Sequence, residues 1–199
     1  MNLRVQLVVA LAIVCSMAVF AQPNVTVDSP FQVRYAANVG PTSAGDSVIN
    51  ITNGGATNGN ICVNVYTFSP DEQEVSCCSC VVTPNGLVNL SVKNDLISNT
   101  LTPAVPSSVV VKLLATTGAA CNAAAPGALA SGMLAWGTTN HALSGAAGLS
   151  TTETAFSPAT ISAGELARIS SLCGFIQSNG SGFGICRSCR SGAQGAAQK

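Results

Sequence analysis

Charged side chains are scarce in this sequence. Of its 199 residues, 8 are Lys or Arg, 8 are Asp or Glu and one is His, so 8% of the chain is charged and the formal net charge is zero. An average globular protein carries about a quarter charged residues. This scarcity excludes a polybasic nucleic-acid-binding protein and an acidic solvating tail, and it argues against an enzyme rich in titratable groups.

Beyond the N-terminus the sequence also lacks an uninterrupted hydrophobic run. The longest apolar stretch, 123–137, contains Pro and Gly and cannot form a transmembrane helix. Residues 1–21 differ, because Arg4 precedes an apolar stretch over 5–20 and small residues lie before Gln22. This pattern is typical of a signal peptide cleaved before Gln22. We therefore expect a secreted protein, extracellular, at the cell surface or in the periplasm, with no membrane span after cleavage.

Cysteine, by contrast, is abundant. One of the nine cysteines, Cys15, belongs to the expected signal peptide. An even number then remains in the mature chain, which in an exported protein predicts a framework of four disulfides, each contributing about 2–4 kcal/mol. The eight are Cys62, Cys77, Cys78, Cys80, Cys121, Cys173, Cys186 and Cys189.

Strand geometry narrows the pairing of these cysteines. Successive side chains on a strand point to opposite faces, so Cys78 and Cys80 share a face and Cys77 points to the other. A hairpin turn centred near Asp71 would place Cys62 opposite Cys80 and predicts that bridge. A second prediction joins Cys173, late on a helix, to Cys186 or Cys189 in the segment that follows.

Metal binding is the alternative interpretation of the cysteines. Cys77-Cys78-x-Cys80 and Cys186-x-x-Cys189 look like zinc half-sites, but zinc ribbons need two well-spaced pairs and usually occur in reducing compartments. The single histidine, His141, is far from both groups in sequence. The Cys186-x-x-Cys189 pair also does not open a helix after a strand, as a thioredoxin-like motif would. We expect no metal and no cofactor.

The mature chain up to about residue 117 consists of short alternating runs separated by Gly, Asn and Pro. This pattern predicts a mainly β protein, an antiparallel β-sandwich of which the immunoglobulin-like arrangement is one form. The predicted strands are 31–35, 47–52, 61–66, the second strand of the hairpin with Cys77 to Cys80, 88–93 and 109–114. In the Ala-, Gly- and Thr-rich middle region, 133–138 is either a further strand or a helical turn or irregular loop.

One helix is predicted from local signals. Ser162-Ala-Gly-Glu165 matches a capping box, in which the Ser hydroxyl accepts from the backbone N–H of Glu165 and the Glu carboxylate reaches back. Apolar residues then recur at helical spacing as far as Ile176, and Asn179-Gly180 provides an ending. We expect a helix over 163–178 that packs on the sandwich.

The predicted organisation follows from these elements. It comprises a signal peptide at 1–21, a β-sandwich domain at 22–160, a disulfide-stapled helix and tail at 161–191, and a disordered C-terminus at 192–199.

Candidate chemical groups are few. Asp71, Glu72 and Glu74 form an acidic cluster that we expect to be solvated at a hairpin tip. His141 with a carboxylate such as Glu153 would suit a small extracellular hydrolase, but neither a nucleophile elbow nor a metalloprotease motif accompanies them. Catalytic residues are therefore not assigned.

Three aromatic residues are candidates for ligand binding. Trp136, Tyr35 and Tyr66 are the Trp and Tyr residues of the chain, and an aromatic platform for stacking sugar rings would have to use them. The β-sandwich class together with these aromatics favours a carbohydrate-binding module as an alternative function.

Several segments resemble a group of uncharacterised secreted bacterial proteins. They are residues 60–73, the Ser76-Cys-Cys-Ser-Cys cluster, Val82-Thr-Pro-Asn-Gly-Leu87, and the capped helix with Leu172-Cys-Gly-Phe-Ile-Gln. The resemblance covers under half of the mature chain and implies export and disulfides. No established activity comes with it.

The leading hypothesis from the sequence is a secreted, disulfide-stabilised, non-enzymatic structural or surface-interaction protein, adhesive or filament-like. A robust covalent framework and scarce catalytic groups support it. The expected partners are another copy of the chain or a cell-surface polymer, and not nucleic acid. The alternatives are the carbohydrate-binding module and, second, the hydrolase using His141.

Overall fold

The computed structural model describes residues 29–118, 120–143, 145 and 147–187. The expected signal peptide and the segment 192–199 therefore lie outside the described residues. Within the described part, no helix is long and apolar enough to cross a membrane. The elements are β1 (Phe31–Ala37), β2 (Ser47–Asn53), β3 (Ile61–Phe68), β4 (Glu74–Val82), β5 (Leu87–Ser91), the π-helix η1 (Val92–Leu96), β6 (Ser108–Thr116), β7 (Met133–Ala142), β8 (Leu149–Ala155), β9 (Ser157–Pro158) and α2 (Ala163–Ser178).

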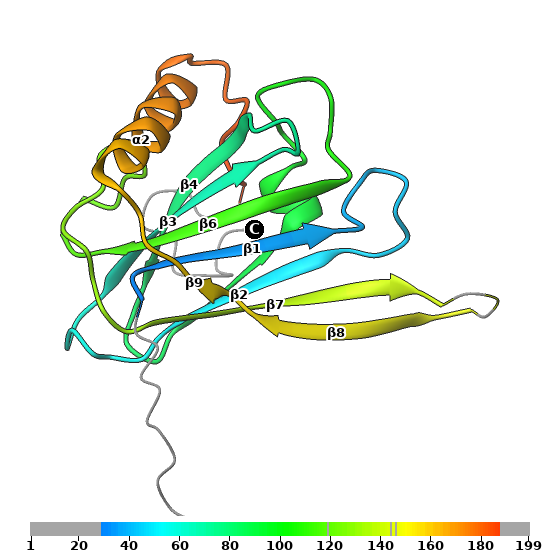
Figure 1. The fold of residues 1–199 in the computed structure, drawn as a ribbon, viewed down its shortest axis with the longest axis horizontal. Helices are drawn as coiled ribbons and strands as arrows, with labels where there is room; N and C mark the ends of the chain where they lie inside the picture. The colour runs from blue at the N-terminus through cyan, green and yellow to red at the C-terminus, as the bar shows by residue number, and fades with distance from the viewer. Residues whose placement is uncertain (1–28, 119, 144, 146, 188–199) are drawn as a thin grey trace, which may run out of the picture.

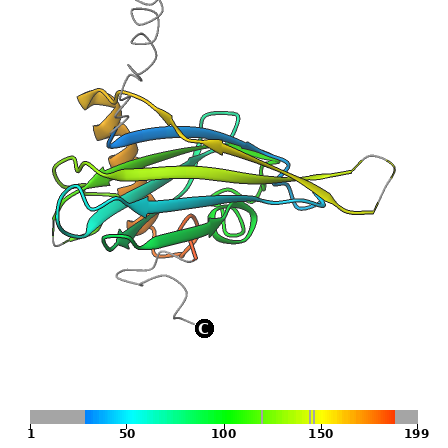
Figure 2. The same ribbon diagram turned by 90° about the horizontal axis from the view of Figure 1, so that it is seen from below.

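The strands form two packed antiparallel sheets, so the predicted sandwich is confirmed (Figures 1 and 2). Sheet A has the strand order β4-β3-β6-β1-β9, and sheet B has the order β5-β2-β7-β8. The β7–β8 hairpin reaches beyond the rest of the sandwich in both views. The chain crosses from sheet B to sheet A between β8 and β9.

The predicted strands are all present, β4 being the second strand of the expected hairpin, with differences at the strand ends and two additions. The last of them is β7, which extends to Ala142. Val92 and Lys93 were expected in a strand but belong to η1, because Ser91 caps that turn: its Oγ accepts from Asn94 N at 2.8 Å, and its own N–H donates to the Asp95 carboxylate at 2.8 Å. The strands β8 and β9 were not predicted from the sequence.

The main core lies between the two sheets. Alternate side chains of every long strand point inward, as the pleat requires. Sheet B contributes Ile49, Ile51, Leu90 and Met133, and sheet A contributes Val63, Val65, Val111 and Leu113, all of them inaccessible to solvent. Burial of these side chains supplies most of the driving force that holds the sheets together.

A second core lies between the outer face of sheet A and α2, the helix expected over 163–178, which is confirmed. Ile169, Cys173 and Ile176 of α2 pack against Phe31, Tyr66, Phe68 and Leu114 of the sheet. The Ser162 Oγ accepts from Glu165 N at 3.1 Å. The carboxylate half of the capping box does not form as expected, because the Glu165 carboxylate pairs with Lys112 and Arg168.

Candidate functional site

Three disulfides tie the outer parts of the molecule to β3 and β4. Cys62 on β3 is bonded to Cys121 in the loop after β6, Cys77 on β4 to Cys173 on α2, and Cys78 on β4 to Cys186 in the segment after α2. Cys80 is also disulfide-bonded, whereas Cys189 lies outside the described residues. The bridges indicate an oxidising environment of the kind found outside the cytoplasm.

The predicted Cys62–Cys80 bridge is wrong because of a β-bulge. Near the turn the register is the expected one, with Phe68 opposite Glu74, but it shifts by one residue between Thr67 and Phe68. Cys80 therefore lies opposite Val63, and Cys62 lies opposite Val81. A shift of one residue sends a side chain to the other face of the sheet, so Cys62 and Cys80 point in opposite directions.

The predicted pairing of Cys173 with Cys186 or Cys189 is also wrong. Because Cys173 lies on the helix face that packs on sheet A, it meets Cys77, the cysteine that points to the same side of β4. Cys78 and Cys80 share the inner face of β4, as the strand pattern predicts, and the inner-facing Cys78 takes Cys186.

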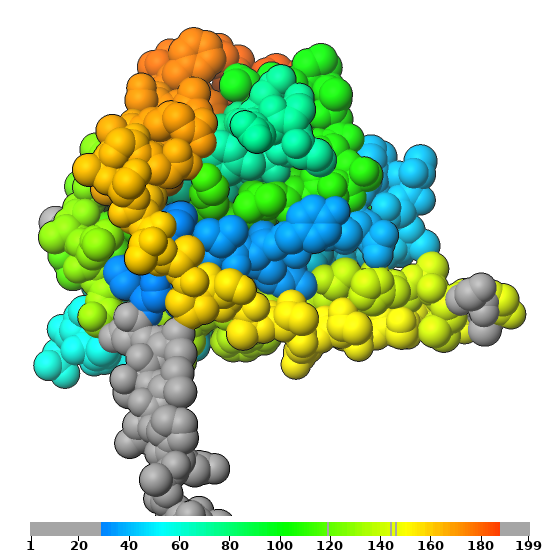
Figure 3. Space-filling view, viewed as in Figure 1, coloured from blue at the N-terminus to red at the C-terminus, as the bar shows by residue number. Residues whose placement is uncertain are grey.

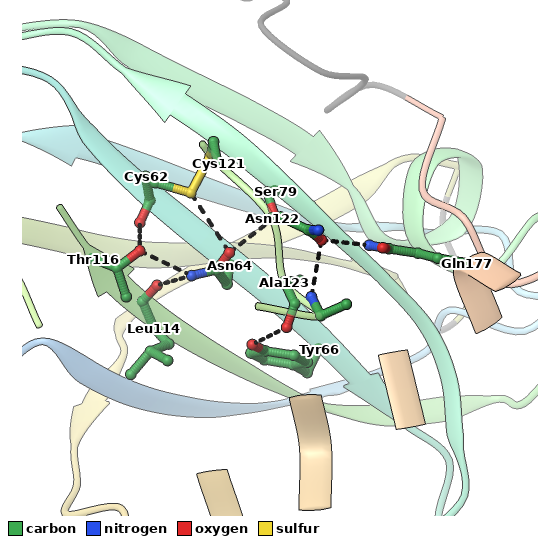
Figure 4. Close-up of a disulfide and its surroundings, with 11 residues drawn as sticks. Cys62, Asn64, Tyr66, Ser79, Leu114, Thr116, Cys121, Asn122, Ala123 and Gln177 are labelled. Carbon is green, nitrogen blue, oxygen red and sulfur yellow. Dashed lines mark hydrogen bonds between the residues drawn. A yellow bond between two sulfur atoms is a disulfide. The ribbon is translucent and has the colours of Figure 1, made fainter. Parts of the chain in front are cut away.

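The Cys62–Cys121 bridge lies beside a buried polar network (Figure 4). The Asn64 amide donates to Leu114 O at 3.3 Å and to Thr116 Oγ1 at 3.1 Å, and its oxygen accepts from Ser79 Oγ at 2.9 Å. All three partners lie on the strands that flank β3. The network fastens three strands of sheet A to one another next to the bridge.

Tyr66 belongs to the same region and cannot stack on a ligand. Its side chain is fully buried under α2, and its hydroxyl donates to Ala123 O at 2.8 Å. Burial raises its pKa well above the ordinary value. The expectation that Tyr66 is part of a binding platform is therefore wrong, and the residue anchors the loop after β6.

The other two candidate aromatics lie on different faces of the sandwich. Tyr35 is 61% exposed on the outer face of sheet A, because it alternates with the inward-facing Arg34 and Ala36. Trp136 is half-buried on the outer face of sheet B, since its neighbours Ala135 and Gly137 are the buried ones. The structure does not bring the three aromatics together into one platform.

A line of hydrogen-bonded polar side chains lies beside Trp136 on the outer face of sheet B. Asn89 on β5 donates to the Asn50 oxygen at 2.7 Å, and the Asn50 amide donates to Thr138 Oγ1 at 3.3 Å. The Thr138 hydroxyl in turn donates to the Glu153 carboxylate at 3.3 Å. This line, which we call the polar ladder, crosses all four strands of sheet B, and Trp136 lies opposite Asn50 in the strand register. Sequence reasoning missed it because its members are distant in sequence.

A depression of about 260 Å³ borders Trp136 where β8 leaves sheet B. Its lining is mostly apolar and comprises Gln32, Leu134, Ala135, Trp136, Ala155, Phe156 and Pro158. The Gln32 amide is already engaged, with bonds to Ser29 O at 3.1 Å and Met133 O at 3.0 Å. The depression thus offers shape and apolar contact, and the polar groups lie beside it on the sheet.

His141 and Glu153 do not form an acid–base pair. His141 Nδ1 lies 3.1 Å from Asn38 Nδ2, and His141 Nε2 lies 3.0 Å from Thr152 Oγ1. Glu153 is opposite Thr138 in the register, whereas His141 is opposite Ser150, so the two side chains leave opposite faces of the β7–β8 hairpin. The predicted hydrolase dyad is therefore not assembled.

Glu74 departs from the expected solvated cluster. Asp71 and Glu72 are exposed at the hairpin tip, but Glu74 is 5% exposed beneath α2 and neither of its carboxylate oxygens has a hydrogen-bond partner. Burial raises its pKa from 4.5 to about 8, against the opposing influence of Arg168 and Lys112. One of its oxygens lies within 4.8 Å of the Cys77 and Cys173 sulfurs. Since those sulfurs form a bridge, they are not thiolate ligands for a metal.

A small charged group surrounds Phe68 beside Glu74. Lys112 and Arg168 both pair with Glu165, at 2.6 and 2.9 Å, and both lie over the Phe68 ring. The hydrogen bond from Arg168 lowers the Glu165 pKa to about 2. Phe68, Lys112 and Arg168 border a depression of about 290 Å³. The Lys112–Glu165 ion pair fastens α2 to the sheet.

The comparisons with known proteins are sparse. No family model matches the chain, and no curated protein matches it. Among solved structures, the chain is similar to the crystal structure of Thermotoga maritima 1070, with a TM-score of 0.40 and 11% sequence identity. The match covers 63% of this chain and 89% of that chain. A likeness at this level carries no argument about function.

Proposed function

We propose that the chain is a secreted, non-enzymatic surface-interaction protein that binds a neutral polysaccharide on the outer face of sheet B. The observation that carries the proposal is the position of Trp136, which is half-buried next to the polar ladder on the side of the sandwich opposite α2. The signal-like N-terminus and the disulfides support secretion.

The chemistry of this face suits a sugar chain. An indole ring offers a broad apolar surface to the C–H groups of a pyranose ring, and the exposed Leu87 and Leu134 extend the apolar area on either side of Thr52. The amides and hydroxyls of the polar ladder are donors and acceptors for sugar hydroxyls. Because these groups are already held by one another on rigid strands, little side-chain entropy is lost on binding.

The low charge of the chain also favours this class of ligand. The polar ladder contains one carboxylate, Glu153, and no basic side chain. A strongly anionic or cationic polymer would need clustered opposite charges, whereas a neutral polysaccharide needs hydrogen bonds and stacking.

The test is a glycan array followed by co-sedimentation with insoluble polysaccharides, using the secreted protein. We expect Trp136→Ala to weaken binding at least tenfold. Tyr35→Ala is the matched control, because it removes an exposed aromatic ring from the other sheet, and it should leave binding unchanged. Binding to no glycan, or equal binding by the wild type and Trp136→Ala, would overturn the proposal.

A further inference from the structure

The strand β8 is an open sheet edge. It is the last strand of sheet B and, among the described residues, it pairs on one side only, with β7. All seven of its residues are exposed, and in Figure 3 its yellow surface forms the margin of the molecule. Its outer backbone N–H and C=O groups are a template for a further strand.

The other three sheet edges are covered or short. The edge of β4 is covered by the segment after α2, where Cys77 N donates to Gly184 O at 2.8 Å and Cys186 N to Cys77 O at 3.4 Å. The strand β9 has two residues, one of them Pro158, and β5 has five residues and runs directly into η1. The sequence of β8, LSTTETA, contains neither Pro nor Lys, the residues that most often block such edges, and its single charged residue is Glu153.

The middle of β8 is nevertheless ordered, since four consecutive side chains form hydrogen bonds, three with β7 and one with β1 of the other sheet. Two of these bonds are on each face of the hairpin. The pairs are Thr151 with Asn140 at 2.9 Å, Thr152 with His141 at 3.0 Å, Glu153 with Thr138 at 3.3 Å, and Thr154 with Arg34 at 3.0 Å. An exposed strand held in this way is preorganised for pairing, because little backbone entropy remains to be lost.

We propose that β8 pairs antiparallel with β8 of a second copy of this chain, which joins the two copies of sheet B into one continuous sheet. The strand is self-complementary about Thr152. In that register Thr151 lies opposite the other copy's Glu153, whose carboxylate can accept the Thr151 hydroxyl proton in place of the Asn140 oxygen, and Leu149 lies opposite Ala155. The chain's zero net charge adds little repulsion between copies. This inference is independent of polysaccharide binding.

The test places charges at one position of the paired strands. Thr151→Glu sets a carboxylate opposite Glu153 of the other copy, whereas Thr151→Lys sets an ammonium group there. Both substitutions remove the same Thr151–Asn140 hydrogen bond, so each controls for the other. Sedimentation equilibrium of the secreted protein should show a concentration-dependent dimer, weakened at least tenfold by Thr151→Glu and not weakened by Thr151→Lys.

Amide hydrogen exchange locates the interface. Exchange over 149–155 should slow as the protein concentration rises, while exchange in β5, the other edge of the same sheet, should not change. A chain that stays monomeric at millimolar concentration overturns the proposal. The open edge of β8 would then be available for pairing with an extended segment of another protein. A dimer that both substitutions affect equally overturns it as well, because the contact then lies elsewhere.

Discussion

Arg34 fills the space that a side chain at residue 137 would occupy. A Cβ added to Gly137 would overlap the Arg34 guanidinium. From sheet A the guanidinium reaches across to sheet B, where it donates to Ser47 Oγ at 3.1 Å, Thr139 Oγ1 at 2.8 Å and Thr154 Oγ1 at 3.0 Å. Among the described residues no carboxylate pairs with it. Three hydroxyls therefore solvate a buried cation, and Gly137 provides the room.

The first prediction concerns this contact. Gly137→Ala should displace the guanidinium and break its three hydrogen bonds, which we expect to lower the free energy of unfolding by about 3 kcal/mol in urea titrations. Gly164→Ala is the control, because a Cβ there meets no atom closer than 4.0 Å and the residue lies in α2. The control should be as stable as the wild type or slightly more stable. Equal stability of both variants would contradict the prediction.

The second prediction concerns Glu74 and pH. Its folded-state pKa of about 8 lies above the ordinary 4.5, so between these values the unfolded chain is ionised while the folded chain keeps its proton. The stabilising contribution of the protonated Glu74 side chain to folding is complete below pH 4.5 and is lost as the pH rises through 8. The loss lowers the free energy of unfolding by about 3–5 kcal/mol. Glu74→Gln should remove this loss, so that the variant unfolds at a higher urea concentration than the wild type at pH 8.

Glu165 provides the opposite pH dependence in the same cluster. Its pKa is lowered to about 2, so its stabilising contribution is present above 4.5 and is lost as the pH falls toward 2. Denaturant midpoints of the wild type measured across the pH range should therefore peak near the ordinary carboxyl pKa. A midpoint that rises steadily from pH 5 to 8 would show that Glu74 is ionised in the folded protein.

The third prediction concerns the bridge between Cys77 and Cys173. Replacing both residues by Ala opens a loop with a sequence separation of 96, which should cost about 4 kcal/mol. Amide exchange in α2 should accelerate, because the bridge fastens the helix to β4. The matched variant, Cys62→Ala with Cys121→Ala, should lose comparable stability without faster exchange in α2. Unchanged exchange of α2 in the first variant would contradict the prediction.

The fourth prediction concerns Asn64. Asn64→Ala leaves the Leu114 carbonyl and the Ser79 hydroxyl without their buried partner, which should lower the free energy of unfolding by about 2 kcal/mol. Asn140→Ala, at a half-buried position on β7, should cost less than half as much. Thermal unfolding followed by circular dichroism compares the two variants. A similar loss of stability in both would show that the buried Asn64 network stabilises the fold no more than the Asn140 hydrogen bond does.

Local signals in the sequence were sufficient for some elements. The helix over 163–178 was predictable because its cap, its periodicity and its Gly ending all lie within about twenty residues. The strands of the core were predictable because at least one face of each is buried. In contrast, β8 was missed because both of its faces are exposed, so no hydrophobic alternation marks it.

The sequence by itself determined a cysteine-rich, antiparallel β protein with one helix, since composition, strand alternation and helix capping are local properties of the chain. Only the tertiary structure decided which cysteines pair, because a single bulge at Thr67 reverses the face of Cys62 relative to Cys80. It also decided that Glu74 and Tyr66 are buried while Trp136 borders the polar ladder. The physical reason is that register and helix docking depend on contacts between segments far apart in sequence, which no local pattern records.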